Sequence, residues 1–362
     1  MIREHCFQLE WIERLRAQEE YQKINPPLVE KMIHALSLVQ QLQVHGLDFI
    51  FKGGTSLILL LAQANRFSVD VDIITQAGRE DIERLLNRMV QSTPFYRWEL
   101  DAHRSYKPGV PKAHYKLEYT SNFIKAGNTI LLDILFEKPH YPEIQELPIQ
   151  SHWIETETLI SVKLPTIEAI TGDKLTAFAP NTTGIQYGKE KELEIIKQLF
   201  DLGHLFEQVK AVDIVAASYD AFVQQELAYR GLELPPRDVL WDTIHTCRII
   251  GFRDSNKKDP DRYRFMDLRT GIQNFSNHLI SGYFRIDQAV TASAKVAYLC
   301  ARLMVEDYTP LQRYAGQDVQ TLNIAHPEWN VLNKLKRLPD QSAFFYWYEC
   351  LKVLEQKGFS LN

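Results

Sequence analysis

The sequence has little cysteine and no long apolar run, and these two absences exclude several classes of protein. Its four cysteines are scattered over 362 residues without a C-x-x-C pair, so neither a zinc site nor a thiol redox motif is indicated. Isolated thiols are typical of a reducing compartment, and we expect a cytoplasmic protein. No stretch is apolar enough to span a bilayer, and the charged segment 1–18 lacks the core of a signal peptide, so we expect no membrane partner.

The chain also lacks an excess of positive charge. It contains 41 lysines and arginines against 46 aspartates and glutamates, a net charge of −5. A general electrostatic attraction to nucleic acid is therefore excluded, and any contact with RNA must use a local patch. The segment 102–117 is the best candidate for such a patch because its four cations, Arg104, Lys107, Lys112 and Lys116, have no acidic residue among them. A solvated hairpin is the alternative interpretation of this segment.

The hydrophobic pattern changes near residue 164. Before that point helical spacing alternates with short strand-like runs, whereas after it helical spacing prevails. We therefore expect an α+β protein with two domains, at residues 1–164 and 165–362. In the first domain we expect helices at 7–45, 57–63 and 79–91, and strands at 47–51, 69–74, 96–100, 113–119 and 129–136. In the second domain we expect helices at 166–179, 189–205, 212–230, 236–250, 261–280, 286–306 and 340–357.

A glycine-rich turn interrupts the first apolar run. It consists of Lys52, Gly53, Gly54, Thr55 and Ser56, after a strand-like segment and before a helix-like one. Two glycines let the backbone turn sharply and approach a ligand closely. The helix start behind them offers free N–H groups and a positive dipole end, which suit a phosphate group. The turn therefore predicts a phosphate-binding site.

Two aspartates follow on the next expected strand, which reads VDVDII from Val69 to Ile74. Side chains two apart on a strand share one face, so we expect Asp70 and Asp72 to point together. Two adjacent carboxylates repel each other unless a cation lies between them or one is protonated. Mg²⁺ suits such a pair because it binds one or two carboxylates together with substrate phosphates. D-x-D alone is typical of a solvated pair, but the preceding glycine turn favours a catalytic metal site.

A third aspartate, Asp133, lies in the otherwise apolar strand expected at 129–136. Burying an acidic side chain is costly unless it is paired or bound to a metal. Beside the first two aspartates, Asp133 would complete a three-carboxylate metal site. The alternative is a structural residue that caps a loop or meets an arginine.

Three of these segments, 52–56, 66–72 and 132–134, together resemble the AbiEii/AbiGii toxin family of nucleotidyltransferases, which belongs to the DNA polymerase β-like superfamily. The likeness continues at 173–178, which is similar to the family's K-L-x-A helix, and at 197–202, which is similar to its R-D-x-x-D-L segment. The resemblance implies an N-terminal polymerase-β-like nucleotidyltransferase fold with a mixed sheet, followed by an α-helical C-terminal domain.

The resemblance also implies an activity, namely transfer of a nucleoside monophosphate from an NTP with release of pyrophosphate. In this interpretation residues 52–56 and Ser68 hold the triphosphate. Asp70, Asp72 and Asp133 bind Mg²⁺, with Mn²⁺ as the alternative ion, or Asp133 is the base that accepts the proton of the acceptor hydroxyl. Family members are toxins of toxin–antitoxin or phage-defence systems, so we expect a cognate antitoxin and an acceptor that is RNA, such as tRNA, or protein.

Two residues of the second domain are expected in the active site only because of the resemblance. Lys174 would neutralise charge on the triphosphate, and Asp201 would position Lys174 or the acceptor, with the active site in the cleft between the two domains. Without the resemblance, an exposed helix pair is the favoured interpretation of these two residues. The sequence departs from the family pattern at Gln198, which replaces an aspartate, and at Lys197, which replaces an arginine. Because glutamine cannot serve as a carboxylate ligand or base, the role of position 198 must differ here.

Two other functions fit part of the pattern. In a glycosyltransferase, D-x-D binds a metal and a nucleotide diphosphate, but the glycine turn ahead of it and the lack of repeated βαβ units speak against that function. A binding module that holds a nucleotide without turnover is supported only by Gln198, and the intact set of three aspartates weighs against it. Labelled NTP and labelled nucleotide-sugar would distinguish the two enzymatic alternatives.

Overall fold

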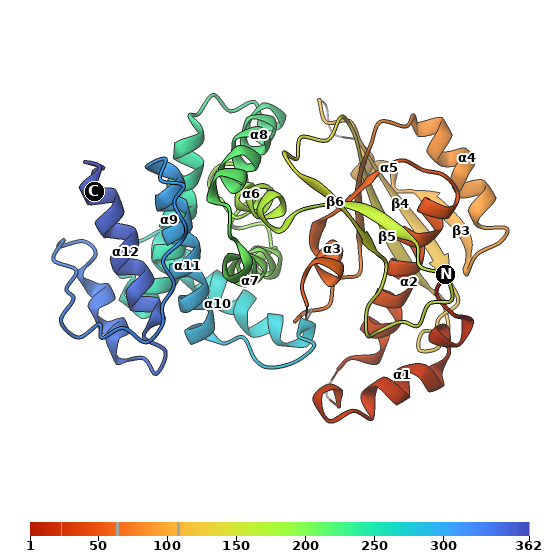
Figure 1. Cartoon of the computed structure of the whole chain (residues 1–362), viewed down its shortest axis with the longest axis horizontal. Coiled ribbons are helices and arrows are strands. Elements are labelled where there is room, and N and C mark those ends of the chain that lie inside the picture. The colour runs from red at the N-terminus through yellow and green to blue at the C-terminus, as the bar shows by residue number, and fades with distance from the viewer. Residues whose placement is uncertain (23, 63–64, 107–108, 362) are drawn as a thin grey trace. The chain divides into compact units, whose positions relative to one another are not determined.

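The computed structural model describes residues 1–22, 24–62, 65–106 and 109–361, which form two compact units (Figure 1). Unit 1 comprises Met1–Thr166 together with Asn277–Gly282, and unit 2 comprises Ile167–Ser276 and Tyr283–Asn362. Some expected features, Gln63 at the end of a helix and Lys107 with Pro108 in the basic segment, lie outside the described residues.

In its described part, unit 1 is built on one mixed seven-stranded sheet with the order β3-β4-β5-β2-β1-β7-β6. The strands are β1 (Ile50–Lys52), β2 (Val71–Thr75), β3 (Phe95–Leu100), β4 (Lys112–Tyr119), β5 (Asn128–Phe136), β6 (Ile144–Pro148) and β7 (Ser161–Pro165). The pairs β1–β7 and β2–β5 are parallel, and the other neighbouring strands are antiparallel. The sequence pattern missed β6 and β7 as strands, because both are short and each ends in a proline.

One face of this sheet forms the core of unit 1. In β5, Ile130, Leu132 and Ile134 are buried in the hydrophobic cluster, whereas Asp133 between them is only half-buried. The same alternation in β2 turns Val71 and Ile73 toward the core, as expected when successive side chains point to opposite faces. The second face of the sheet carries Asp72 and Asp133, together with apolar residues such as Ile50 and Ile74.

Helix α2 (Pro26–Val44) contacts β2, β5 and β7 and supplies much of the core face. The helical stretch expected at 7–45 is interrupted ahead of it, because Asn25 precedes a proline and is extended, with φ −82° and ψ 109°. The remaining helical elements of unit 1 are η1 (Glu4–Phe7), α1 (Leu9–Arg16), η2 (Glu19–Tyr21), α3 (Gly53–Leu60), α4 (Arg79–Met89) and α5 (Ala102–Ser105).

Unit 2 is helical in its described part. Its α-helices are α6 (Ile167–Ala177), α7 (Glu192–Gln208), α8 (Val212–Arg230), α9 (Pro236–Phe252), α10 (Asp261–Phe275), α11 (Ile286–Met304) and α12 (Ser342–Gln356). Its 3₁₀ helices are η3 (Arg253–Ser255) and η5 (Asn330–Arg337), whereas η4 (Ser276–His278) begins in unit 2 and ends in unit 1. The helix expected at 261–280 ends at Phe275, and the chain from Asn277 to Gly282 belongs to unit 1, where Phe67 N donates to His278 O at 2.8 Å.

The α+β fold class predicted from the sequence is confirmed by the mixed sheet and the helices that follow it. Within the described residues, no helix has the length and apolar character needed to cross a membrane.

A close backbone approach between two helices of unit 2 gives a test of its packing. A Cβ added to Gly172 of α6 would lie 2.6 Å from Tyr219 N and 2.6 Å from Val215 O, both on α8. We expect Gly172→Ala to lower the free energy of unfolding by about 1–3 kcal/mol, because backbone atoms cannot move aside as a side chain can. Thermal denaturation should show a Tm several degrees lower, and an unchanged Tm would contradict this packing. Gly78→Ala is the control, because its Cβ would meet only the end of Asp81, at 3.2 Å.

Candidate active site

The glycine turn consists of Lys52 at the end of β1 and the first four residues of α3, which begins four residues earlier than the helix expected at 57–63, and it lies directly against Asp72. Gly53 has φ +75°, and a Cβ there would lie 2.1 Å from Oδ2 of Asp72. A Cβ on Gly54 would lie 2.6 Å from Nη2 of Arg66 and 2.7 Å from Oγ of Ser68. Gly53 therefore requires glycine, whereas a side chain at Gly54 would displace Arg66 and Ser68. Arg66 is a buried cation that sequence reasoning left out of the site, although it belongs to the same 66–72 segment.

The hydroxyl groups of the turn are turned inward. Thr55 and Ser56 are fully buried, and Ser56 Oγ donates to Gly53 O at 2.8 Å. The Thr55 hydroxyl pairs with Ser68 Oγ at 3.0 Å and donates to the carbonyl oxygen of Asp70. The Thr55 bonds hold the turn against the segment that carries the aspartates, and the Ser56 bond closes the turn itself. Both hydroxyl groups therefore stabilise the local structure.

A row of four polar residues crosses the open face of the sheet. Lys52 of β1 is the register partner of Asp72 in β2, Asp72 is the partner of Asp133 in β5, and Asp133 is the partner of His114 in β4. Register partners lie on the same face of a sheet, and adjacent strands are about 4.8 Å apart. The fold thus brings together two predicted aspartates and the predicted lysine, which are far apart in the sequence. Asp70 is half-buried and precedes β2, which begins at Val71, two residues later than expected.

Asp133 already has two basic neighbours. Its Oδ1 lies 2.6 Å from Nδ1 of His114, and its Oδ2 lies 3.2 Å from Nη2 of Arg104. Because a carboxylate only accepts, Nδ1 of His114 carries the proton in this pair. Nε2 of His114 is buried without a hydrogen-bond partner among the described residues. Sequence reasoning missed His114; the alternation in 112–119 was the available signal, since it sets position 114 on the polar face.

The residues that could hold a metal ion here are acidic. Among the described residues, no three His, Cys, Asp or Glu side chains are grouped so that they could hold a metal. Asp70 and Asp72 are half-buried carboxylates beside the glycine turn, and Asp133 is hydrogen-bonded to His114 and Arg104. Hard carboxylate oxygens suit Mg²⁺, which takes its other ligands from water and substrate phosphates.

In the described part of the basic segment 102–117, at residues 102–106 and 109–117, acidic side chains pair with two of the cations. Lys116 Nζ lies 3.3 Å from Glu99 and 3.3 Å from Asp101, and Arg104 pairs with Asp133. Hydrogen bonding to Asp101, and then to Glu99, raises the pKa of Lys116. The acids that pair with Lys116 come from β3 and the residue after it, outside the segment, which is why a local count of charges missed them. Two of the four cations are thus occupied by acidic partners.

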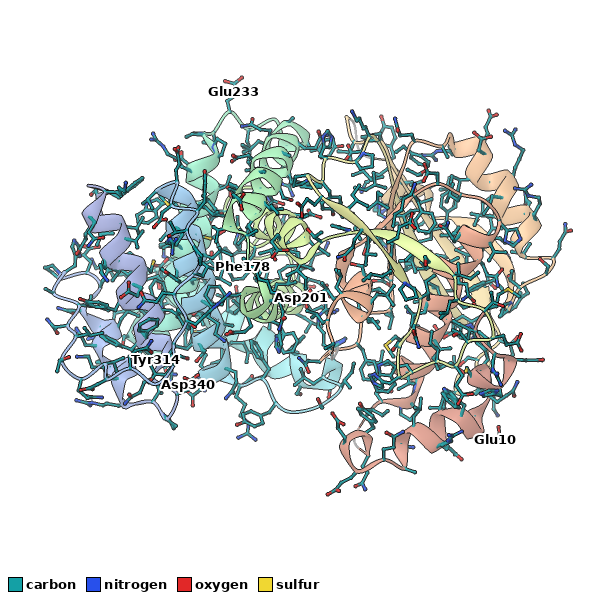
Figure 2. The ribbon with its side chains drawn as sticks, in the orientation of Figure 1. Glu10, Phe178, Asp201, Glu233, Tyr314 and Asp340 are labelled. Carbon is teal, nitrogen blue, oxygen red and sulfur yellow. The ribbon has the colours of Figure 1, made fainter. Side chains whose placement is uncertain are left out.

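In unit 2, Lys174 of α6 and Asp201 of α7 form a buried ion pair. Asp201 is labelled in Figure 2. Nζ of Lys174 lies 2.8 Å from Oδ2 of Asp201, and the two side chains are only 7% and 2% exposed. Nζ also donates to Oε1 of Gln198 at 3.2 Å. Gln198 thus accepts a hydrogen bond from Lys174 without carrying a charge. A second carboxylate at this position would give the cluster an excess of negative charge.

The sequence matches the family described as nucleotidyl transferase AbiEii toxin, type IV TA system, over residues 37–280, which is more than half of the chain. The chain belongs to the AbiEii family. It is thus a nucleotidyl transferase toxin of a type IV toxin–antitoxin system, as its motifs predict, and membership implies a nucleotide substrate and an antitoxin. No curated protein matches the sequence.

Solved structures with some similarity have low sequence identity. JHP933 from Helicobacter pylori is 15% identical with a TM-score of 0.42, and the alignment covers 77% of this chain and 91% of that one. A putative nucleotidyltransferase from H. pylori is 18% identical with a TM-score of 0.34, covering 71% and 95%. An antigenic nucleotidyltransferase-like protein from Paracoccidioides brasiliensis is 16% identical with a TM-score of 0.34, covering 56% and 93%.

The buried ion pair predicts a large stability effect. Lys174→Ala leaves the Asp201 carboxylate buried without its counter-charge, so the free energy of unfolding should fall by about 3–5 kcal/mol. Gln198→Ala removes one neutral acceptor and should cost about 0.5–1.5 kcal/mol. The double variant Lys174→Met with Asp201→Leu should recover most of the loss, because it removes both charges. Urea denaturation measures all three, and equal losses for Lys174→Ala and Gln198→Ala would contradict this account.

Proposed function

We propose that this AbiEii protein transfers a nucleoside monophosphate from an NTP to an acceptor hydroxyl at the glycine turn, with Mg²⁺ as the metal and Mn²⁺ as the alternative. The observation that carries the proposal is the row of Lys52, Asp72, Asp133 and His114 on one face of the sheet, with Gly53 against the Asp72 carboxylate. Phosphate-binding donors and hard anionic ligands therefore meet at one point of unit 1.

The triphosphate binds at the start of α3. The first N–H groups of a helix have no intrahelical acceptor and carry partial positive charge, so they suit phosphate oxygens. Lys52 adds a cationic side chain at the end of β1, and Arg66 lies beside Gly54. Thr55, Ser56 and Ser68 keep the turn in shape through the hydroxyl bonds described above. The absence of side chains at both glycines leaves room for the Asp72 carboxylate beside Gly53 and for Arg66 and Ser68 beside Gly54, so these groups lie close to the start of the helix.

Asp70 and Asp72 hold the metal ion, which when bound neutralises the charge that develops on the phosphates. Asp133 accepts the proton of the acceptor hydroxyl. The acceptor oxygen forms a bond to the α-phosphorus, the bond from that phosphorus to the bridging oxygen breaks, and pyrophosphate leaves. Asp133 retains lone pairs for the proton because each carboxylate oxygen can accept more than one hydrogen bond. His114 and Arg104 fix its orientation, at 2.6 and 3.2 Å.

The proposal extends to unit 2. Lys174 and Asp201 match motif positions of the family, and we assign Lys174 to the charge of the triphosphate and Asp201 to the positioning of Lys174. The 2.8 Å ion pair between them supports the second assignment. We assign the catalytic domain to residues 1–164 and the helical domain to 165–362. The acceptor is an RNA such as tRNA, or a protein, and family membership favours an NTP donor over a nucleotide-sugar.

Substitution of the two metal-binding aspartates tests the proposal. Asp70→Asn and Asp72→Asn should each lower transfer by about two orders of magnitude or more, because a neutral amide cannot replace an anionic ligand. The assay uses each α-labelled NTP with Mg²⁺ and, in separate reactions, total cellular RNA or total protein as acceptor. The labelled product then identifies donor and acceptor together.

The matched control is Glu10→Gln, which makes the same acid-to-amide change on the exposed surface of α1 and should keep parental activity. Circular dichroism should show that all variants are folded. Transfer by Asp72→Asn within about twofold of the parent would refute the assignment of the metal site.

A further inference from the structure

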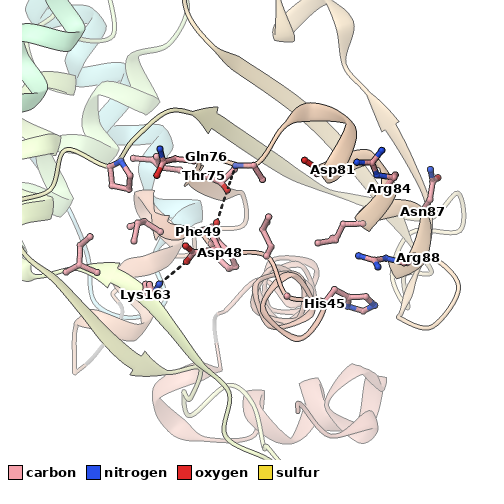
Figure 3. Close-up of a pocket in the computed structure, with 18 residues that line it drawn as sticks. His45, Asp48, Phe49, Thr75, Gln76, Asp81, Arg84, Asn87, Arg88 and Lys163 are labelled. Atoms are coloured by element: carbon pink, nitrogen blue, oxygen red, sulfur yellow. Dashed lines mark hydrogen bonds and ion pairs between the residues drawn. The ribbon is translucent and has the colours of Figure 1, made fainter.

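A large pocket lies in unit 1, at the start of β1 and the end of β2 (Figure 3). Its volume is about 1120 Å³, and its lining residues come from the end of α2, from α4 and from the strand ends. Neither the residues of the glycine turn nor the three aspartates of the candidate active site line it. Its position is nevertheless close, because Ile50 and Ile74 line the pocket and pair two residues along from Lys52 and Asp72.

Cationic side chains gather at one side of this pocket. Arg84 and Arg88 are four residues apart on α4, so they lie on the same side of that helix. Figure 3 shows both of them, with His45 from the end of α2, on the side opposite the Asp48–Lys163 ion pair. The arginine fork matches the geometry of a phosphate group and binds it through paired N–H groups.

These arginines are available to an incoming anion. Among the described residues, Arg88 forms no ion pair and its side chain makes no hydrogen bond. Arg84 pairs with Asp81 and lies 3.9 Å from Glu80, but its side chain is 69% exposed. Such exposed pairs contribute at most about 1 kcal/mol, so a phosphate can displace Asp81 at little cost.

The other residues that line the pocket can contact the organic part of a phosphorylated ligand. Leu47, Phe49 and Leu85 are among the residues that line the pocket and give it an apolar wall. At the far side, Lys163 Nζ lies 2.9 Å from Oδ1 of Asp48, which supplies both a donor and an acceptor. Small-molecule sites typically measure about 300–1,000 Å³ and combine apolar walls with a few polar groups, so this pocket has room for a nucleotide-sized ligand.

We propose that this pocket binds a phosphorylated small molecule of nucleotide size, with its phosphate on Arg84 and Arg88 and its organic part along the apolar wall. This site is separate from the triphosphate turn in its lining residues. It lies about 7 Å away along β1 and β2, since two residues of a strand span that distance.

Isothermal titration of the full-length protein with 5′-AMP, and separately with inorganic phosphate, tests the proposal. EDTA is present throughout, so that metal-dependent binding at the catalytic turn does not contribute. We expect AMP to bind more tightly than phosphate, and Arg88→Gln and Arg84→Gln each to weaken AMP binding by at least tenfold, as expected for the loss of a charged hydrogen-bond donor.

Two controls separate this site from other sources of binding. Lys125→Gln removes an exposed cation elsewhere in unit 1 and should leave AMP affinity unchanged, as should Lys52→Gln at the candidate active site. The proposal is overturned if neither ligand binds at millimolar concentration, or if Arg88→Gln binds AMP as well as Lys125→Gln does. Loss of binding in Lys52→Gln would assign AMP to the catalytic turn and overturn the proposal. Arginine-dependent binding of an RNA hairpin without binding of AMP would also overturn it.

Discussion

The close approach of the Asp72 carboxylate to Gly53 is the constraint on which the candidate active site depends. With Oδ2 of Asp72 2.1 Å from where a Cβ would lie, no other residue fits at position 53. The approach follows from the β1–β2 register, in which Lys52 faces Asp72. A slip by one residue would turn Asp72 to the core face and break the row that continues to Asp133 and His114. Strand register and glycine turn therefore specify the site together.

In both units, several charged side chains that are buried or half-buried are paired with groups of opposite charge or with hydrogen-bond partners. On the open face of the sheet, Asp133 is held between His114 and Arg104. In unit 2, Lys174 and Asp201 are almost fully buried, and Gln198 completes the cluster without adding charge. A buried charge without a partner would be strongly destabilising, so each of these groups depends on its neighbour. The departure from the family pattern at position 198 thus keeps one positive charge opposite one negative charge.

Local pattern was enough to predict much of the fold. The expected strands at 113–119 and 129–136 correspond to β4 and β5 within one residue, and the helix expected at 212–230 is α8. The local pattern could not predict which polar side chains on neighbouring strands would contact one another. His114 meets Asp133 only because β4 pairs with β5 in one register, and Lys116 meets acids from outside its own segment. Strand pairing and register depend on contacts distant in sequence, which a single sequence does not specify.

The most direct test of the metal-dependent site is a crystal of the protein grown with Mn²⁺ and a non-hydrolysable NTP analogue. Anomalous scattering from manganese locates the ion independently of any activity assay. The account predicts a peak in direct contact with the carboxylates of Asp70 and Asp72 and with phosphate oxygens, and a triphosphate against Gly53 and Gly54. A nucleotide bound away from this turn, or a manganese peak that neither aspartate contacts, would contradict it.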